Sequence, residues 1–380
     1  MEGSTKEPLN GISVVILTQN RITYAKRLLS SLHQELKSFE GQAEVVVIDN
    51  SKPEQSVSIA AICREHNYGF YFFKGSISEA RNYGLKIAKF SIVLFIDSDC
   101  EIVHGILQEH ITSYERGDIG SVLGLTNFTG KENWVWKAIA RTPFHIAFSF
   151  AKRTDYAPWG PCTNISFRKD VIEKVGGFRT DFPFDFSGED VDIGLRINEL
   201  GYKIKCNPRA LVNHNRETWS SLPRFCKKIF RWGRTDFHIL KHHPQLSTTD
   251  FPKFTTILLL LLASSVISEL TGTGWIICRL LMTWLLCVPI VEALLRSHVL
   301  ERKITGFLSN YISFWLNFTF EFGSVFESLK HGSFSMLYKK IAYGQGQFIF
   351  EWKQKVVQSW SFIVTLMIFL FILALTYKAL

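Results

Sequence analysis

The sequence lacks the cysteine spacing that would indicate a disulfide framework or a structural zinc site. Its seven cysteines show no paired spacing, whereas both kinds of site usually place cysteines in close pairs. A secretion signal is also missing, because the first residues are polar and the first apolar run, residues 12–17, is too short. We therefore expect the amino-terminal half to stay in the cytoplasm, a reducing compartment.

Glycine-rich nucleotide-binding loops are absent as well. No GxGxxG or GxxxxGK[ST] element follows the first apolar run, which argues against a dinucleotide fingerprint and against a P-loop. Any nucleotide must then be held by side chains. Asp49 is suited to accept hydrogen bonds from a base or ribose, and Arg81 could counter the charge of a diphosphate. A turn-forming aspartate and a surface arginine are the alternative interpretations.

Long apolar runs are missing from the first two thirds of the 380-residue chain and recur in the last third. This pattern predicts a globular part followed by a membrane region over residues 251–380. The net charge of +9 is compatible with nucleic acid, anionic lipid or a phosphorylated substrate as a partner. The position of the basic residues has to decide among these partners.

Apolar runs of strand character alternate with amphipathic helical patterns in the first part of the chain. The runs cover residues 12–17, 44–48, 69–73 and 92–96. Strands that alternate with helices favour a parallel, doubly wound α/β sheet. In such sheets ligands bind outside the carboxyl ends of the strands. We therefore expect a site where the polar residues that follow these runs come together.

Two carboxylates, Asp97 and Asp99, follow the fourth apolar run directly. Hard oxygen ligands at a strand end suit a Mg²⁺ or Mn²⁺ ion that also holds substrate phosphates. A solvated turn or an acidic cap of the next helix is the alternative, since aspartate caps helices well. The spacing by itself leaves both interpretations open.

Four motifs follow one another between residues 18 and 99: TQNR, IDNS, SEARNYG and FIDSD. In this order they resemble the nucleotide-sugar-binding half of a family 2 glycosyltransferase with the GT-A fold. The resemblance extends over residues 11–215 and implies a catalytic domain at residues 1–215. It also implies that Asp99 contacts a metal bound to the donor diphosphate and that Asp97 lies nearer the ribose and sugar. The donor-binding positions are then Thr18, Asn20, Arg21, Asp49, Arg81 and Asp97.

A second acidic pair, Glu189 and Asp190, stands at a predicted helix start. Acids in a first helical turn favour the helix dipole and need no further role. The family resemblance implies more: Asp190 as the catalytic base and Glu189 as a neighbour that orients the acceptor. It also singles out Asn164 in the segment that shapes the sugar pocket, and His214 as a further metal ligand. A satisfied loop histidine remains the alternative for His214.

Residues 216–250 contain a basic amphipathic helix and a linker. One face carries apolar residues and another carries arginines and lysines, which suits the interface of an anionic leaflet and makes nucleic acid a less favoured partner. Within this helix, residues 228–232 resemble the (Q/R)xxRW motif of membrane-embedded family 2 synthases, with lysine at the first position. The resemblance implies that Arg231 meets the diphosphate and Trp232 the acceptor, and we place Lys228 with the donor.

The membrane region contains three candidate spans, residues 254–270, 275–295 and 356–377. Residues 304–326 are interrupted by Asn310, Asn317 and Glu321, and a crossing there would place a basic loop outside. We therefore predict that this segment is interfacial or re-entrant, and that the catalytic domain lies on the cytoplasmic face.

The leading hypothesis is a membrane-bound, metal-dependent, inverting glycosyltransferase. It would move a sugar from a nucleotide-sugar donor, with UDP the favoured nucleotide, to a lipid-linked or cell-surface saccharide. A processive polysaccharide synthase and a polyprenyl-phosphate sugar transferase are alternatives within the same family. An inactive membrane-anchored sugar-binding protein is an alternative from another class, against which the two acidic pairs argue.

Overall fold

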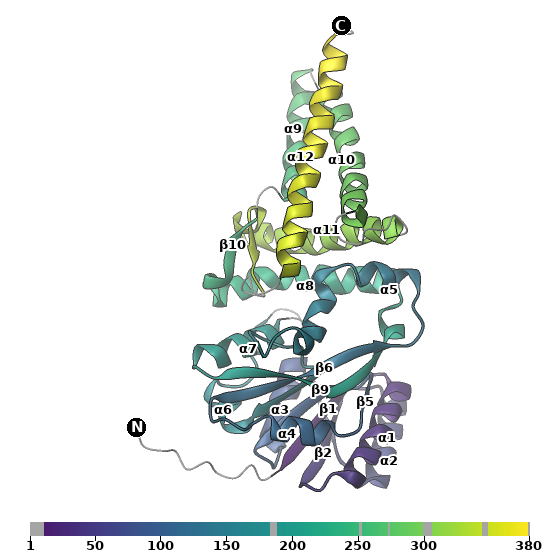
Figure 1. Ribbon diagram of the computed structural model, residues 1–380, viewed down its shortest axis with the longest axis vertical. Coiled ribbons are helices and arrows are strands. Elements are labelled where there is room, and N and C mark those ends of the chain that lie inside the picture. Colours follow the sequence, from purple (N-terminus) through teal and green to yellow (C-terminus); the bar gives the residue numbers. More distant parts are fainter. Residues whose placement is uncertain are drawn as a thin grey trace. The chain divides into compact units, whose positions relative to one another are not determined.

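The computed structural model describes residues 11–182, 188–250, 253–272, 274–298, 306–343 and 349–378. Its chain forms two compact units, one from Met1–Lys131 and His145–Thr218, the other from Glu132–Phe144 and Trp219–Leu380 (Figure 1). Residues 132–144 thus group with the carboxyl-terminal unit, although they lie inside the predicted catalytic domain.

The first unit is built on one mixed sheet with the strand order β3-β2-β1-β4-β8-β6-β9-β5, in which β7 also pairs with β9. Neighbours among the first four strands are parallel, whereas β8 is antiparallel to both β4 and β6. The strands are β1 Ile12–Thr18, β2 Ala43–Asp49, β3 Gly69–Phe72, β4 Ile92–Asp97, β5 Cys100–Ile102, β6 Ile119–Thr129, β7 Tyr156–Ala157, β8 Asn164–Arg168 and β9 Lys203–Asn215. The predicted α/β fold with a mostly parallel sheet is confirmed for β1, β2, β3 and β4. Strand β8 then adds antiparallel pairs to the sheet.

Amphipathic helices connect the parallel strands. They are α1 Ile22–Ser38, α2 Pro53–Glu65 and α3 Ile77–Ile87, and the unit adds α4 Ile106–Thr112, α6 Lys169–Lys174 and α7 Glu189–Glu199. Helix α3 begins with a capping box, in which the Ser76 side chain accepts from the Glu79 backbone and Glu79 accepts from the Ser76 backbone. This reciprocal pair satisfies two backbone donors and fixes where the helix starts.

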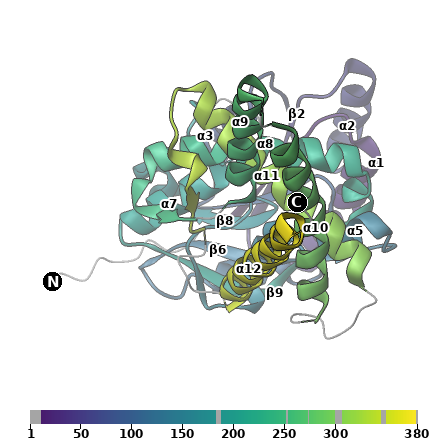
Figure 2. The same cartoon turned by 90° about the horizontal axis from the view of Figure 1, so that it is seen from above.

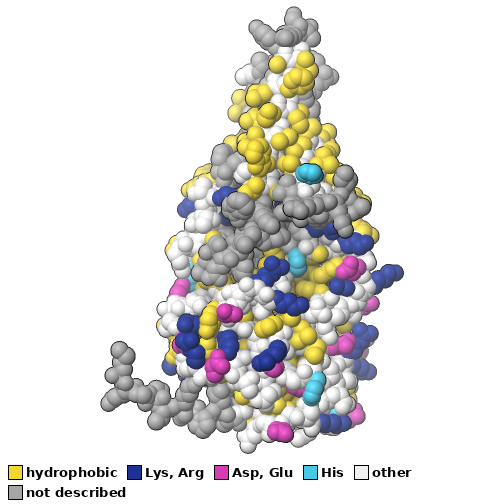
Figure 3. Space-filling view, in the orientation of Figure 1, with side chains coloured by type: hydrophobic (Ala, Val, Ile, Leu, Met, Phe, Trp, Pro, Cys, Tyr) yellow, Lys and Arg dark blue, Asp and Glu magenta, His cyan; other side chains and the backbone are white. Residues whose placement is uncertain are grey.

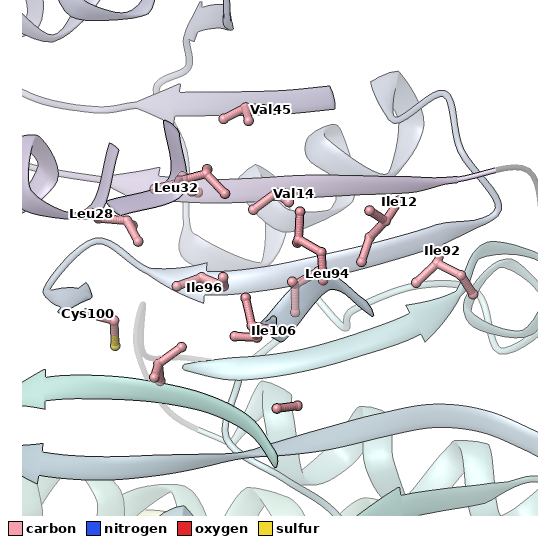
Figure 4. Close-up of a cluster of buried hydrophobic side chains, with 14 of the residues drawn as sticks. Ile12, Val14, Leu28, Leu32, Val45, Ile92, Leu94, Ile96, Cys100 and Ile106 are labelled. Carbon is pink, nitrogen blue, oxygen red and sulfur yellow. The ribbon is translucent and has the colours of Figure 1, made fainter. Parts of the chain in front are cut away.

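The core of the first unit lies between α1 and the parallel strands. Figure 4 shows Leu28 and Leu32 of α1 facing Val14 of β1 and Ile96 of β4, all nearly inaccessible to solvent. Burial of each such side chain contributes about 1.5–3 kcal/mol. This packing holds the strands in register, with Thr18 opposite Asp49 and Leu17 opposite Asp97. The polar ends of β1, β2 and β4 therefore meet at one edge of the sheet.

The second unit is helical. Its helices are α5 Trp134–Ile139, α8 Leu222–His242, α9 Phe254–Thr271, α10 Gly274–Arg296, α11 Phe307–Lys330 and α12 Ile349–Lys378, and β10 Ser247–Thr249 pairs with β11 Lys339–Ile341. Figures 1 and 2 show α9, α10 and α12 running alongside one another, while α11 lies across them. Helix α11 follows α8 closely, because Gly233 of α8 and Gly323 of α11 each leave no room for a Cβ against the backbone of the other helix.

Among the described residues, one helix has the length and apolar character needed to cross a membrane. This helix is α9, with 18 residues and a mean hydropathy of 1.8, and a shorter apolar stretch covers Lys355–Ile368. Figure 3 shows hydrophobic side chains gathered over the long helices of the second unit. The three predicted spans and the interfacial segment at residues 304–326 stay predictions.

Candidate active site

The turn after β4 brings Asp99 against His214. Strand β5 pairs with the end of β9, with Cys100 opposite His214, so a histidine far away in the sequence lies beside the strand tip. His214 Nε2 is 3.4 Å from Asp99 Oδ1, and both side chains are buried. Arg21, just before α1, donates from Nη1 to Asp99 Oδ2. Two predicted metal ligands are therefore neighbours, with a guanidinium beside them.

The donor atoms at this position fit a divalent cation. Ligand atoms of Asp99, Cys100 and His214 all lie within 4.8 Å of one another. Burial, followed by the charges of Asp99 and Asp97, raises the pKa of the Cys100 thiol well above its ordinary value, which favours the neutral thiol in the metal-free protein. The Asp99 carboxylate and the His214 imidazole are the other two donors, and both donor types bind divalent metals.

Asp97, the third predicted metal ligand, lies outside this set of converging atoms in the part of the chain that the structure describes. Its Oδ2 accepts a hydrogen bond of 2.7 Å from Thr163 Oγ1. Strand β8 makes this contact possible, because it pairs antiparallel with β4 and places Asn164 opposite Ile96. Asp97 is therefore only two residues from Asp99, but its carboxylate is bonded to Thr163, next to β8, and not to His214 or Arg21 in the contacts described.

The tips of β1 and β2 form a second polar group. Ser51 Oγ donates to Asp49 Oδ1 at 2.6 Å and accepts from the Asn20 backbone N–H at 2.7 Å. Asn20 adopts a left-handed backbone with φ of 54°, which asparagine tolerates better than most residues. Two buried atoms here, Thr18 Oγ1 and Asp49 Oδ2, have no hydrogen-bond partner in the described structure. Unpaired buried polar atoms are costly, so a ligand that pairs with them would be favoured.

The second acidic pair opens α7 after Gly188, whose φ of 91° is left-handed. Glu189 Oε1 accepts a hydrogen bond of 2.5 Å from Arg81 Nη1, and each of the two residues is only 5% exposed. Burial, followed by the charge of Glu189, raises the pKa of Asp190 to about 7, although Arg81 acts in the opposite direction. A carboxyl with this pKa is suited to exchange a proton near neutral pH.

The Cys162 thiol shows that these groups converge. Burial is the main cause that raises its pKa; Asp190, Glu189 and Asp97 raise it further, and Arg81 lowers it. The charges of Glu189 and Asp97 likewise act on Arg81. The β4 tip, α3 and the start of α7 therefore contribute charged groups around one centre. The roles predicted for Asp99 and Asp190 at one shared site stay predictions.

Asn164, which the family resemblance singled out in the segment that shapes the sugar pocket, makes hydrogen bonds inside the first unit. It is fully buried, and its Nδ2 donates to the backbone oxygens of Leu125 and Ala210 at 3.0 and 2.9 Å. Its Oδ1 lies 3.0 Å from His110 Nε2. Because both ends of the amide are used inside the unit, Asn164 ties β8 to its neighbours and we do not carry it into the proposed acceptor site.

The predicted (Q/R)xxRW residues lie on α8, in the second unit. Lys228 Nζ sits over two indole rings, 4.2 Å from the Trp219 centroid and 4.9 Å from the Trp232 centroid. The Trp232 ring also packs against Phe144 and Phe225. These contacts form an aromatic cluster around Lys228. Arg231, on the same helix, is half-buried. Contacts of Lys228, Arg231 and Trp232 with substrates stay predictions.

Sequence reasoning missed Thr163, Ser51 and Cys162. Thr163 precedes Asn164 in the PCTN stretch, so it lay next to a position that had been singled out. Its role depends on the pairing of β8 with β4, which no local pattern specifies. Ser51 belongs to the IDNS motif, and the polar strand end was the available signal for it.

Comparison with known proteins adds a family to this geometry. The Glycosyl transferase family 2 model matches residues 13–176. A pre-mycofactocin glycosyltransferase of Mycobacterium tuberculosis is 28% identical over 218 residues, covering 54% of this chain and 43% of the relative. A poly-β-1,6-N-acetyl-D-glucosamine synthase of Staphylococcus epidermidis is 22% identical over 251 residues, covering 62% and 57%. The chain thus spans about half the length of these curated relatives.

Among solved structures, the mannosyltransferase PcManGT from Pyrobaculum calidifontis in complex with GDP-Man and Mn²⁺ aligns with a TM-score of 0.44 at 17% identity. The alignment covers 63% of this chain and 67% of that one. The family match includes β1, β2 and β4 with the acids at their tips. Residues 13–176, which hold most of the mixed α/β sheet, are thus similar to the Glycosyl transferase family 2 model.

Proposed function

We propose that this protein is a metal-dependent, inverting glycosyltransferase that uses a UDP-sugar donor and a lipid-linked or cell-surface saccharide acceptor. The observation that supports the proposal is that Asp97, from the β4 tip, and the pair Glu189 and Asp190, from the start of α7, all act on the Cys162 thiol, with Arg81 bonded to Glu189. One pair stands beside a group of potential metal ligands, and the other contains a carboxyl with a pKa near 7. Transfer of a sugar from a diphosphate needs both functions: charge to stabilise the leaving group and a base for the acceptor hydroxyl.

The donor nucleotide is assigned to the tips of β1 and β2. Asp49 Oδ2 is a buried acceptor without a partner, and Thr18 Oγ1 beside it can donate or accept. A uracil ring offers an imide N–H next to carbonyl oxygens, which is complementary to this pair. Arg21, with its side chain 47% exposed, can turn toward a diphosphate while it remains near Asp99. These features support UDP over nucleotides that lack an imide N–H.

Asp99 and His214 are the residues assigned to hold the metal, with Mn²⁺ the better match to their mixed oxygen and nitrogen donors. A bound ion supplies positive charge that stabilises the departing diphosphate. The chain's own contribution is to fix the two donors: β5 pairing holds His214 in place, and Arg21 orients the Asp99 carboxylate.

Asp190 is assigned as the base. In the hydrogen bonds described, Arg81 bonds to Glu189 and not to Asp190. The Asp190 carboxyl is therefore available to accept a proton, while the arginine is bonded to the carboxylate next to it. A single displacement assisted by this base inverts the anomeric centre. Glu189, held by the buried ion pair, positions the start of α7 and keeps a negative charge next to Asp190.

Membrane attachment is part of the proposal. Helix α9 is long and apolar enough to cross a bilayer, and Arg224 and Lys227 are exposed on α8, where they can contact anionic headgroups. A catalytic unit anchored in this way meets acceptors that are themselves anchored in lipid. Processive polymer synthesis is the second candidate function, supported by the similarity to a polysaccharide synthase.

The test is transfer from a panel of nucleotide sugars, with the purified full-length chain in detergent or vesicles. We expect nucleotide release from UDP-sugars, activity only with a divalent ion, and label that moves into a lipid or saccharide fraction. Asp49→Asn should reduce the preference for UDP over other donors by about tenfold, because it replaces the acceptor of one hydrogen bond to the base. Equal use of purine nucleotide sugars would contradict the donor assignment, and long polymer from one incubation would favour the second candidate.

A further inference from the structure

A second group of potential metal ligands lies in the helical unit, on α8 and α11. These two helices lie next to each other (Figure 1), and Gly233 and Gly323 allow their backbones to approach closely. The close approach brings His238, near the end of α8, against Glu327, near the end of α11. His331 follows Glu327 by four residues and caps α11, so it returns to the same side of that helix.

Both imidazoles approach the same carboxylate oxygen. His238 Nε2 is 3.1 Å from Glu327 Oε1, and His331 Nε2 is 3.2 Å from it. The other oxygen, Oε2, accepts a hydrogen bond of 2.6 Å from Arg234 Nε. The arginine therefore fixes the carboxylate with Oε1 turned toward the two histidines. All three ligand atoms lie within 4.8 Å of one another.

The ring positions are constrained by packing. Phe237 stacks on His331 at 5.2 Å and meets His238 edge-on at 5.3 Å. The two imidazole planes are perpendicular, with centroids 5.5 Å apart. Side chains held in this way lose little further freedom when a ligand binds, which is what a built site requires. Glu327 is buried, whereas the His331 side chain is 40% exposed, so an ion has access from solvent.

We propose that His238, Glu327 and His331 bind Zn²⁺ and thereby join α8 to α11. Two imidazole nitrogens and one carboxylate oxygen are a common ligand set for zinc, with a water in the fourth position on the exposed side. Mg²⁺ and Ca²⁺ prefer oxygen ligands and fit poorly here. The zinc would replace the hydrogen bonds to Oε1, and each histidine would carry its proton on Nδ1. The site lies in the other unit from Asp99 and His214 and does not depend on the proposed function.

Zinc binding by the purified full-length chain, with its tag removed and bound metal stripped, tests this proposal. Competition against a chromophoric chelator measures the affinity for Zn²⁺ alone. His331→Gln should weaken the zinc site by at least about 100-fold, because it removes a direct ligand. The matched control is His242→Gln, which alters an exposed histidine one turn farther along α8 and should leave the affinity unchanged.

Two further measurements separate loss of the site from loss of the fold. Zn²⁺ should raise the unfolding temperature of the wild type and of His242→Gln but not of His331→Gln or His238→Gln. Asp99→Asn should keep this zinc site, which distinguishes it from the proposed catalytic metal. Equal zinc affinity in the wild type and in both ligand variants would overturn the proposal. So would an Asp99→Asn variant that binds no zinc, in which case His238, Glu327 and His331 are joined by hydrogen bonds only.

Discussion

The two acidic pairs of the first unit are similar in sequence and differ in their surroundings. At the β4 tip, each acid has its own partner: Asp97 accepts from Thr163, and Asp99 contacts Arg21. At the start of α7, the available cation bonds to only one acid of the pair, Glu189. Its neighbour Asp190 is left with a pKa of about 7, raised first by burial.

The difference teaches how one residue type can serve two tasks. Hydrogen-bond donors and cations beside a carboxylate lower its pKa and keep it charged. Burial beside another negative charge raises the pKa of a carboxyl, so that it can accept a proton near neutral pH. In the proposed function, the placement of Arg81 beside Glu189 and of Arg21 beside Asp99 distinguishes the roles of the two pairs. Four changes test this comparison, from the largest expected effect to the smallest.

Asp190→Asn should have the largest effect, because it removes the proposed base. We expect kcat for transfer to fall by about 1,000-fold, within the range for loss of general base catalysis. The pKa of Asp190 is about 7 in the folded state, compared with an ordinary value of 3.8. Between these two pH values the folded state holds a proton that the unfolded state has lost. The folded protein therefore loses stability as the pH rises from 3.8 to about 7. The variant should therefore unfold at a higher temperature than the wild type at pH 8, with no such gain at pH 3.5. Near-normal turnover would remove Asp190 from the mechanism.

Asp99→Asn tests the other pair. We expect transfer to fall by about 100-fold and the Mn²⁺ concentration for half-maximal rate to rise, because the charged ligand is lost. A chelator should abolish wild-type activity, and added Mn²⁺ should restore it. Asp170→Asn is the matched control, since Asp170 pairs with Arg168 on the surface. A variant that keeps the wild-type Mn²⁺ dependence would show that Asp99 does not bind the metal.

Glu189→Gln sharpens the comparison through pH dependence. The charge of Glu189 helps to raise the pKa of Asp190, so its removal should lower that pKa and leave Arg81 to act more strongly in the same direction. Because the base must be deprotonated, the acidic limb of the kcat/KM profile should move to lower pH by about one unit. Glutamine still accepts a hydrogen bond from Arg81, which keeps the fold. A limb that stays in place would mean that the two acids are not coupled.

Thr163→Val should have the smallest effect. The change removes one hydrogen bond to Asp97 and keeps the side-chain volume, so about 1 kcal/mol, or roughly fivefold in kcat/KM, is expected. Thr154→Val, which removes a hydroxyl that donates to the Tyr156 backbone oxygen, serves as the control. If Thr163→Val matches that control, the hydroxyl does not position Asp97 for the reaction.

Much of the first unit could be predicted from local pattern. Apolar runs of strand length, separated by helical periodicity, place β1, β2 and β4 within a residue or two of their observed bounds. The polar residues that end those runs identify Thr18, Asp49 and Asp97 as members of one edge, since parallel strands align their carboxyl ends. Glu189 and Asp190 were identified at a predicted helix start instead, and the family resemblance supplied the roles predicted for them.

The sequence by itself determined the α/β alternation, the acids at strand and helix ends, and the apolar character of the last third, because these follow from the period and chemistry of neighbouring residues. Only the tertiary structure decided that His214 lies beside Asp99, that Arg81 bonds to Glu189, that Asn164 is an interior tie, and that two helices bring His238 to Glu327. Those contacts depend on strand pairing and helix packing between distant segments, and no local pattern specifies which distant segment will be the partner.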